Sequence, residues 1–358
     1  MNTFYDLAHV DHWPKHEFFR GNLVECFEYP GRFDLILSAM QQQPLGHVSV
    51  AADWGMRWIQ ETHDQEYLDF LQSIHQRWAI ETQASEPQKL EIIPHTFPTR
   101  NLRQTKPSSI FGEVGYFAMD TATPITSATW QAVYGAAQST LSAANDIANG
   151  AQGAFALTRP PGHHASGDGF GGYCFLNFAA IAANVLLSKL RDSKQPERVA
   201  ILDVDFHHGN GTQSIFYARS DVLFTSIHAD PRQAYPYFLG LDDERGEGEG
   251  TGYNLNRPLP LGTAWPTYET ALQQVLQSIH DFDAKYLIVS LGTDTHRLDP
   301  ISGFALETEN FAMIGKAIAG LNLPTVFIME GGYATQVLGE SVWQTLNGFQ
   351  ESTRSPTF

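Results

Sequence analysis

The segment that most constrains the fold is residues 199–211, where an apolar run ends in a cluster of acidic and imidazole side chains. Four consecutive apolar residues are typical of a strand buried on both faces, as in a parallel sheet. The polar side chains begin where the apolar run stops, at the carboxyl end of the strand. While the chain stays extended, Asp203, Asp205 and His207 point to the same side. Two carboxylates and an imidazole predict a metal site, because cations such as Zn²⁺ accept mixed oxygen and nitrogen ligands. The alternative is a solvated turn in which Asp203 caps the glycine-rich residues that follow.

Strands and helices alternate along the rest of the chain. Apolar runs predict strands at residues 154–157, 198–205, 222–227, 286–291 and 325–329. Helical patterns occupy residues 33–40, 64–79, 126–150, 177–190, 266–282, 309–321 and 336–349. This alternation predicts an α/β fold with a doubly wound, mainly parallel sheet flanked by helices. We expect residues 1–358 to form a single domain. Residues 86–109 are too long and too rich in proline for an ordinary connection, which predicts a lid, an interface arm or an insertion.

Charge and cysteine content narrow the function class. The chain has 22 Lys and Arg against 39 Asp and Glu, a net charge of −17, which disfavours nucleic acid or an anionic membrane as a partner and favours a cationic substrate. Cys26 and Cys174 lie far apart, so we expect no disulfide framework and a cytoplasmic location. We find neither a secretory signal pattern nor an apolar run long enough to span a membrane.

Four predicted strands run into unusual polar sequences. These are the pair His163 and His164, residues 203–207, Asp294, and Tyr333 after two glycines. In open α/β sheets the ligand lies in the crevice outside the carboxyl ends of the strands. We therefore expect these four loops to meet at one site.

A catalytic zinc has three protein ligands and one open position. Asp205 and His207 supply two, and Asp294 is the best third. Its rival, Asp299, precedes a proline, where a turn role is the better interpretation. Asp203 lies nearer the strand body and is predicted to hold an imidazole or a structural cation. The ligand types also suit Fe²⁺ or Co²⁺.

Such a site suits hydrolysis of a carbonyl compound, because a bound metal lowers the pKa of water and polarises the carbonyl. The reaction also needs a proton acceptor, a donor for the leaving group and a donor facing the oxyanion. His163 and His164 suit the first two tasks and the Tyr333 hydroxyl suits the third. Taken alone, the histidine pair is equally compatible with metal ligation or a packed turn, and the glycines before Tyr333 with a simple turn.

Several of these motifs, in this order, resemble those of the histone-deacetylase-like amidohydrolases. They are residues 159–165, 172–177 and 203–213, Asp294 with residues 299–300, and residues 330–333. Within that family the chain looks most similar to bacterial acetylpolyamine amidohydrolases. The resemblance implies an arginase/deacetylase-like fold and zinc-dependent hydrolytic deacetylation of small N-acetylated amines, with acetylputrescine and acetylcadaverine as candidate substrates.

The resemblance also implies roles for individual residues. Asp205, His207 and Asp294 match the zinc ligands, His164 the general base, His163 its electrostatic partner and Tyr333 the oxyanion donor. Asp203 matches the carboxylate behind His163, and Asn210 falls where some relatives have an aspartate behind His164. Gly172, Tyr173 and Tyr235 match the walls of the substrate tunnel. A structural K⁺ would use Asp203, Asp205, His207, Ser226 and Ile227.

The proline-rich stretch resembles an insertion, here residues 80–112, that narrows the tunnel and contributes to a homodimer interface in the polyamine enzymes. Family members place acidic residues there to receive the distal ammonium of the substrate. At the aligned positions this chain has Phe111 and Ala122, with Glu113 and Asp120 nearby. We take Glu113 as the substrate-binding candidate. This difference from the family affects which substrate the protein is expected to bind, and it does not affect the deacetylation chemistry.

Two other functions compete with this hypothesis. The same chemistry could act on acetyl-lysine in proteins or on another small amide. A non-catalytic protein that binds acylated ligands is the alternative from another class, and it is disfavoured because every catalytic residue is present. An arginase-type binuclear manganese site is also disfavoured, since residues 203–210 lack a second set of bridging ligands.

Overall fold

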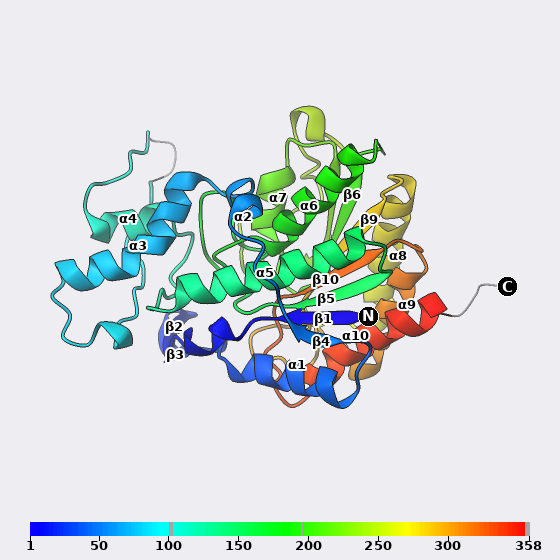
Figure 1. Ribbon diagram of the computed structural model, residues 1–358, viewed down its shortest axis with the longest axis horizontal. Helices are drawn as coiled ribbons and strands as arrows, with labels where there is room; N and C mark the ends of the chain where they lie inside the picture. Colours follow the sequence, from blue (N-terminus) through cyan, green and yellow to red (C-terminus); the bar gives the residue numbers. More distant parts are fainter. Residues whose placement is uncertain (100–102, 195, 355–358) are drawn as a thin grey trace.

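The structure is a computed structural model that describes residues 1–99, 103–194 and 196–354 (Figure 1). Residues 100–102, inside the predicted insertion, lie outside the described part. The strands are β1 (Asn2–Tyr5), β2 (His16–Phe19), β3 (Asn22–Glu25), β4 (Val48–Val50), β5 (Gly153–Leu157), β6 (Val199–Asp203), β7 (Val222–Ala229), β8 (Asn254–Leu259), β9 (Tyr286–Leu291) and β10 (Thr325–Met329). The α-helices are α1 (Gly31–Gln42), α2 (Arg57–Gln60), α3 (Gln65–Glu81), α4 (Ile110–Tyr116), α5 (Thr129–Ala148), α6 (Phe178–Asp192), α7 (Asn210–Phe216), α8 (Trp265–Asp281), α9 (Thr308–Ala319) and α10 (Leu338–Arg354). Short 3₁₀ turns lie at Leu7–Asp11, Pro87–Lys89 and Gly248–Gly250.

Eight strands form one sheet in the order β4-β1-β5-β10-β9-β6-β7-β8. Every neighbouring pair in this sheet is parallel, which confirms the predicted fold class. The sequence did not reveal β1, β4 or β8. β1 and β4 are only four and three residues long, and β8 contains Asn254, Asn256 and Pro258, so none of the three has a long apolar run.

The side chains of alternate residues in the central strands pack into two separate hydrophobic cores, one on each face of the sheet. In β5, Ala154 and Ala156 face the core shared with α5 and α6. Phe155 and Leu157 face the opposite core, which α1, α8, α9 and α10 cover. Because the side chains of a strand alternate between its two faces, this arrangement needs apolar residues at nearly every strand position. In Figure 1, α5 and α6 lie on one side of the sheet and α8, α9 and α10 on the other.

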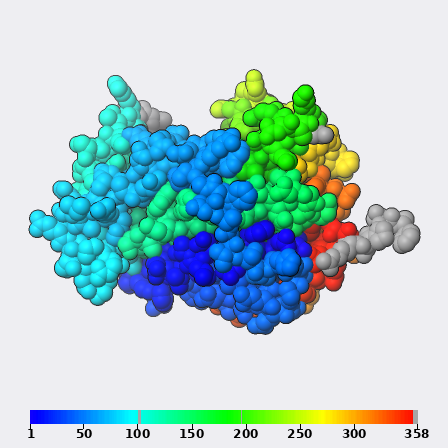
Figure 2. Space-filling view, in the orientation of Figure 1, coloured from blue at the N-terminus to red at the C-terminus, as the bar shows by residue number. Residues whose placement is uncertain are grey.

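Two segments outside the sheet shape the end of the molecule that carries the polar loops. β2 and β3 form an antiparallel hairpin. α3, α4 and the described residues between them (82–99 and 103–109) extend to one end of the molecule, coloured light blue to cyan in Figure 2. Among the helices that the structure describes, none is both long and apolar enough to cross a membrane.

Candidate active site

A cavity of about 280 Å³ opens where the chain leaves β5, β6 and β10. Histidines from two of these loops and a tyrosine from the third line it: His163, His164, His207 and Tyr333. The expected convergence of polar strand ends is therefore present. The other walls come from the residue 172–173 turn, the loop after β7 and the β2–β3 hairpin.

Asp205, His207 and Asp294 come together at the base of the cavity. Their ligand atoms all lie within 4.8 Å of one another, and all three residues are clustered as a group able to hold a metal ion. The Nδ1 atom of His207 is 2.9 Å from Asp294 Oδ2 and 3.2 Å from Asp205 Oδ1. The Phe206 N–H donates to Asp294 Oδ1 at 2.8 Å, which joins the loop after β6 to the loop after β9.

The charge balance of this group fits a divalent cation. Burial, reinforced by the neighbouring Asp205 carboxylate, raises the pKa of Asp294 above its ordinary value. Two buried carboxylates this close are costly without a cation between them. With one imidazole added, the donor set suits Zn²⁺, Fe²⁺ or Co²⁺. Asp299 lies outside the group, because its Oδ2 accepts the Tyr333 N–H at 2.7 Å and its Oδ1 accepts the Ile301 N–H at 3.1 Å.

His163 and His164 are adjacent, but their environments push their pKa values in opposite directions. Burial would lower the pKa of His163, but Asp203 and Asp205 outweigh it and raise that pKa to about 10. Burial and the positive charges of His163 and His207 hold the pKa of His164 well below its usual range. A cationic and a neutral imidazole side by side can divide acid and base roles between them.

The ring partners of the two histidines fix their orientations. His163 Nδ1 lies 2.9 Å from Asp203 Oδ2, and His164 Nδ1 lies 2.7 Å from Asn210 Oδ1. The Asn210 oxygen can only accept a hydrogen bond, so the neutral His164 ring carries its hydrogen on Nδ1 and donates it. Its Nε2 is left with the lone pair that a general base uses.

The predicted K⁺ residues are neighbours in the sheet. The β6–β7 register pairs Asp203 with Ser226, and Ile227 follows in the same strand. Asp203 Oδ1 also accepts the Asp205 N–H at 3.1 Å. The Ser226 hydroxyl lies 2.8 Å from His228 Nδ1.

Tyr333 is held at the cavity from its backbone and from its ring. Arg32 donates through Nε to the Gly332 carbonyl at 2.7 Å, and its guanidinium lies 4.5 Å from the centroid of the Tyr333 ring. Gly331 has no room for a side chain, because a Cβ there would lie 2.6 Å from Asp205 Oδ2. Burial raises the pKa of Tyr333 well above 10, so its hydroxyl keeps its proton and can donate it in a hydrogen bond.

Gly172, Tyr173 and Tyr235, which the resemblance assigned to the walls of a substrate tunnel, all line the cavity. A Cβ on Gly172 would lie 2.2 Å from His164 Cδ2, and its φ of +55° also favours glycine. The Tyr173 ring centroid is 5.8 Å from that of Tyr333, and Tyr235 stands perpendicular to His164 at 5.0 Å. The tunnel is therefore walled by aromatic rings next to the histidine pair.

The structure places Glu113 differently from the prediction. Its carboxylate is buried and pairs with Arg77 and Lys106, and Glu113 is absent from the residues that line the cavity. Two charged partners already occupy it, so it is poorly suited to receive a substrate ammonium.

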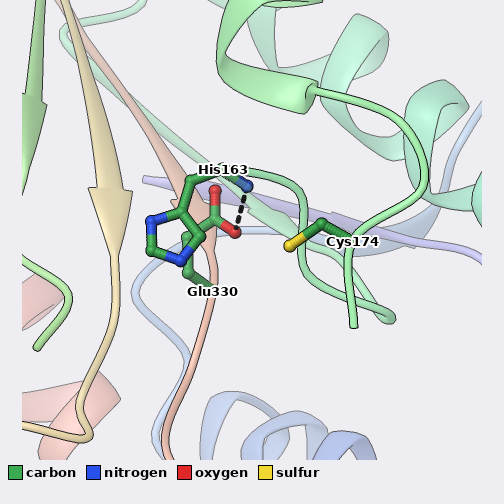
Figure 3. Close-up of side chains that lie close together, drawn as sticks. All are labelled: His163, Cys174 and Glu330. Atoms are coloured by element: carbon green, nitrogen blue, oxygen red, sulfur yellow. Dashed lines mark hydrogen bonds between the residues drawn. The ribbon is translucent and has the colours of Figure 1, made fainter. Parts of the chain in front are cut away.

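Sequence reasoning missed several residues that build this site. Glu330 accepts the backbone N–H groups of Gly162 and His163 at 2.6 and 3.1 Å (Figure 3). His163, Cys174 and Glu330 also lie close enough to hold a metal. The carboxylate is nevertheless engaged with the backbone, and the Cys174 thiol donates to the Gly172 carbonyl at 3.2 Å, so we interpret this cluster as support for the histidine turn. The available signal was an acidic residue directly after the buried β10 strand.

Comparison with known proteins identifies the family of this chain. The model of the histone deacetylase domain matches residues 26–349. The chain belongs to the histone deacetylase family. It is 47% identical over 350 residues to acetylpolyamine amidohydrolase 2 of Pseudomonas aeruginosa, covering 98% of this chain and 99% of the relative. It is 42% identical to the acetylpolyamine amidohydrolase of Mycoplana ramosa, covering 97% of this chain and 99% of the relative.

A solved structure of the same family shares the fold over nearly the whole chain. The crystal structure of acetylpolyamine aminohydrolase from Burkholderia pseudomallei superimposes with a TM-score of 0.90 at 38% identity, covering 98% of this chain and 99% of that one. The predicted family and fold class are thus confirmed.

Proposed function

We propose that this protein is a zinc-dependent deacetylase of small N-acetylated amines, with acetylpolyamines such as acetylputrescine and acetylcadaverine as its substrates. One observation carries the proposal: a buried group of two carboxylates and an imidazole shares a cavity with a neutral His164, a cationic His163 and the Tyr333 hydroxyl. The relatives that match almost the full length are named for acetylpolyamines, which supports this substrate class.

Asp205, His207 and Asp294 would hold the metal. When bound, it supplies a water of lowered pKa and polarises the amide carbonyl. His164 Nε2 accepts a proton from the attacking water, since the Asn210 contact leaves that nitrogen unprotonated. The Tyr333 hydroxyl donates to the carbonyl oxygen as negative charge develops on it. His163, held cationic by Asp203, stabilises that charge, and a protonated histidine then delivers a proton to the leaving amine.

Further features of the protein belong to the same proposal. Asp203, Asp205, His207, Ser226 and Ile227 would bind a structural K⁺ below the metal site. Residues 80–112 would act as an insertion of the single deacetylase domain that borders the tunnel and forms part of a homodimer interface. The location would be the cytoplasm.

The test is acetate release by the zinc-loaded protein from acetylputrescine, acetylcadaverine, acetylspermidine and an acetyl-lysine peptide, with a chelator-treated sample in parallel. We expect chelator-sensitive turnover of the small amines and little turnover of the peptide. Comparable efficiency on the peptide would contradict the substrate assignment, and absence of acetate from every compound would contradict the proposed activity.

A further inference from the structure

Tyr237 and Phe238, in the loop after β7, have backbone conformations that are rare for large side chains. Their φ angles are +61° and +54°, in the left-handed region that favours glycine. Among the other described residues, non-glycine residues with positive φ occur singly, and several lie shortly after the end of a helix, where this conformation is common. These are Gln83, Lys194, Asp283 and Asn322. The loop after β7 does not follow a helix, so its conformation needs another reason.

The cavity supplies that reason. Strained backbone persists only where the surrounding structure holds it, and it clusters at ligand-binding sites. Tyr173, already a wall of the cavity, is one example, with a φ of +66°. Tyr237 lines the cavity too, and it is 43% exposed, so a ligand can reach its ring. Phe238 is absent from the residues that line the cavity. What the strained loop adds to the cavity is therefore the Tyr237 ring.

The Tyr237 ring extends the aromatic wall away from the histidines. The ring centroid of Tyr235 lies 5.0 Å from that of His164 and 6.0 Å from that of His207. The Tyr237 centroid lies 6.5 Å from that of Tyr235, and Tyr237 is the more exposed of the two tyrosines. A substrate whose acetyl group lies at His164 would therefore meet Tyr235 first and Tyr237 with the distal part of its chain.

Gly240, shortly after Tyr237, is held through both of its backbone polar groups. Its N–H lies 2.9 Å from each carboxylate oxygen of Glu244, and its carbonyl accepts a hydrogen bond from His228 Nε2 at 2.8 Å. The φ of Gly240 is +103°, and a Cβ there would lie 2.8 Å from His208 Cγ, so only glycine fits. These contacts fix the chain on one side of Tyr237.

The strained segment thus lies between two anchors. On its other side the Tyr235 hydroxyl donates to Asp120 Oδ2 at 2.6 Å. With the chain held at Tyr235 and at Gly240, the residues between them have little freedom to relax. This restraint accounts for the rare conformation of Tyr237.

We propose that Tyr237 is a specificity-determining residue that contacts the distal part of the substrate chain, and that Glu244 is a positioning residue that holds it there through Gly240. The inference rests on the proposed function and adds to it a residue that selects substrates by chain length. The ligand class is an acetamide on an unbranched alkyl chain that is long enough to pass Tyr235.

The experiment compares N-acetylcadaverine with N-acetyl-1,2-diaminoethane, which has the same two ends and a shorter chain. The quantity measured is the ratio of their kcat/KM values, long over short. Lost contact with one methylene group weakens binding about fourfold, so Tyr237→Ala should lower this ratio about fourfold or more, mainly through KM of the long compound. Tyr237→Phe keeps the ring and should keep the ratio. Phe238→Ala is the matched control, since this neighbouring aromatic residue shares the backbone conformation and lies outside the cavity lining.

Variants of Glu244 test the positioning role. Glu244→Ala removes the acceptor of the Gly240 N–H and should lower the same ratio, whereas Glu244→Gln keeps an accepting oxygen and should retain most of it. When Tyr237→Ala is already present, Glu244→Ala should lower the ratio no further. A role in stability alone would lower Tm and leave the ratio unchanged, because both compounds use the same catalytic groups.

An unchanged ratio in Tyr237→Ala would overturn the role of Tyr237. An unchanged ratio in Glu244→Ala, or a further fall in the double variant, would overturn the positioning role. If the unmodified protein releases acetate from neither compound, the proposed function fails instead. The ratio of the dissociation constants of the two compounds, measured by calorimetry, then decides on Tyr237. If Tyr237→Ala does not fold, Tyr237→Gly takes its place, because glycine adopts a positive φ without strain.

Discussion

Tyr333 is the residue whose role can be isolated most cleanly. Its ring is fixed by Arg32 and Tyr173, so Tyr333→Phe removes the hydroxyl and leaves these contacts in place. Loss of one oxyanion donor lowers kcat by about 10²–10³. We expect a loss of that size with the zinc content unchanged, measured by acetate release and metal analysis. Tyr286→Phe, at the amino end of β9, is the control and should keep full activity. Turnover within about threefold of the unmodified protein in Tyr333→Phe would exclude the hydroxyl from the reaction.

At the same scale, the residues that sequence reasoning located are those that follow long buried strands. Asp205, Asp294 and Tyr333 were found because strand direction alone places their loops at one edge. Asp120 and the β2–β3 hairpin were not assigned, because the position of each at the cavity depends on the packing of elements that are distant in the sequence. Glu113 was misplaced for the related reason that the sequence does not show which cations its carboxylate meets.

At the scale of elements, the turn after α4 ties two tunnel walls together through Asp120. Its Oδ2 accepts the Gly172 N–H at 2.7 Å and the Tyr235 hydroxyl at 2.6 Å. Its Oδ1 accepts the Ala122 N–H and the Thr123 hydroxyl, both at 3.0 Å. Asp120→Ala leaves these donors unsatisfied, at a cost of about 1–3 kcal/mol each when buried. We expect a lower Tm and a larger effect on KM than on kcat, because the walls loosen while the histidine pair keeps its own partners.

Tyr235→Phe separates the two consequences of that substitution. This substitution removes the Tyr235 hydroxyl and its hydrogen bond to Asp120, and it leaves no donor unsatisfied. It should therefore raise KM with a smaller loss of Tm than Asp120→Ala. A double-mutant cycle measures their coupling, which for contacting residues is about 0.5–3 kcal/mol. Additive effects on KM would show that Asp120 does not act through Tyr235.

At this scale, the sequence predicted the buried strands and helices more readily than the exposed ones. β5, β6, β9 and β10 are fully or almost fully buried, and their apolar runs identified them. The sequence did not predict the β2–β3 hairpin, because its two strands are short and most of their residues are exposed. A part of the chain that the sequence did not predict thus supplies one wall of the cavity.

At the scale of the whole molecule, the net charge of −17 should act on charged substrates before they reach the cavity. An acidic protein raises the local concentration of cations, and this long-range effect is screened by salt. The Debye length falls from about 10 Å at 0.1 M to about 3 Å at 1 M ionic strength. Raising the salt concentration across this range should therefore lower kcat/KM for acetylputrescine by a few fold. The value for N-butylacetamide, an acetylated amine of the same chain length without the ammonium group, should stay nearly unchanged. An equal effect of salt on both compounds would exclude attraction of the cationic substrate by the net charge.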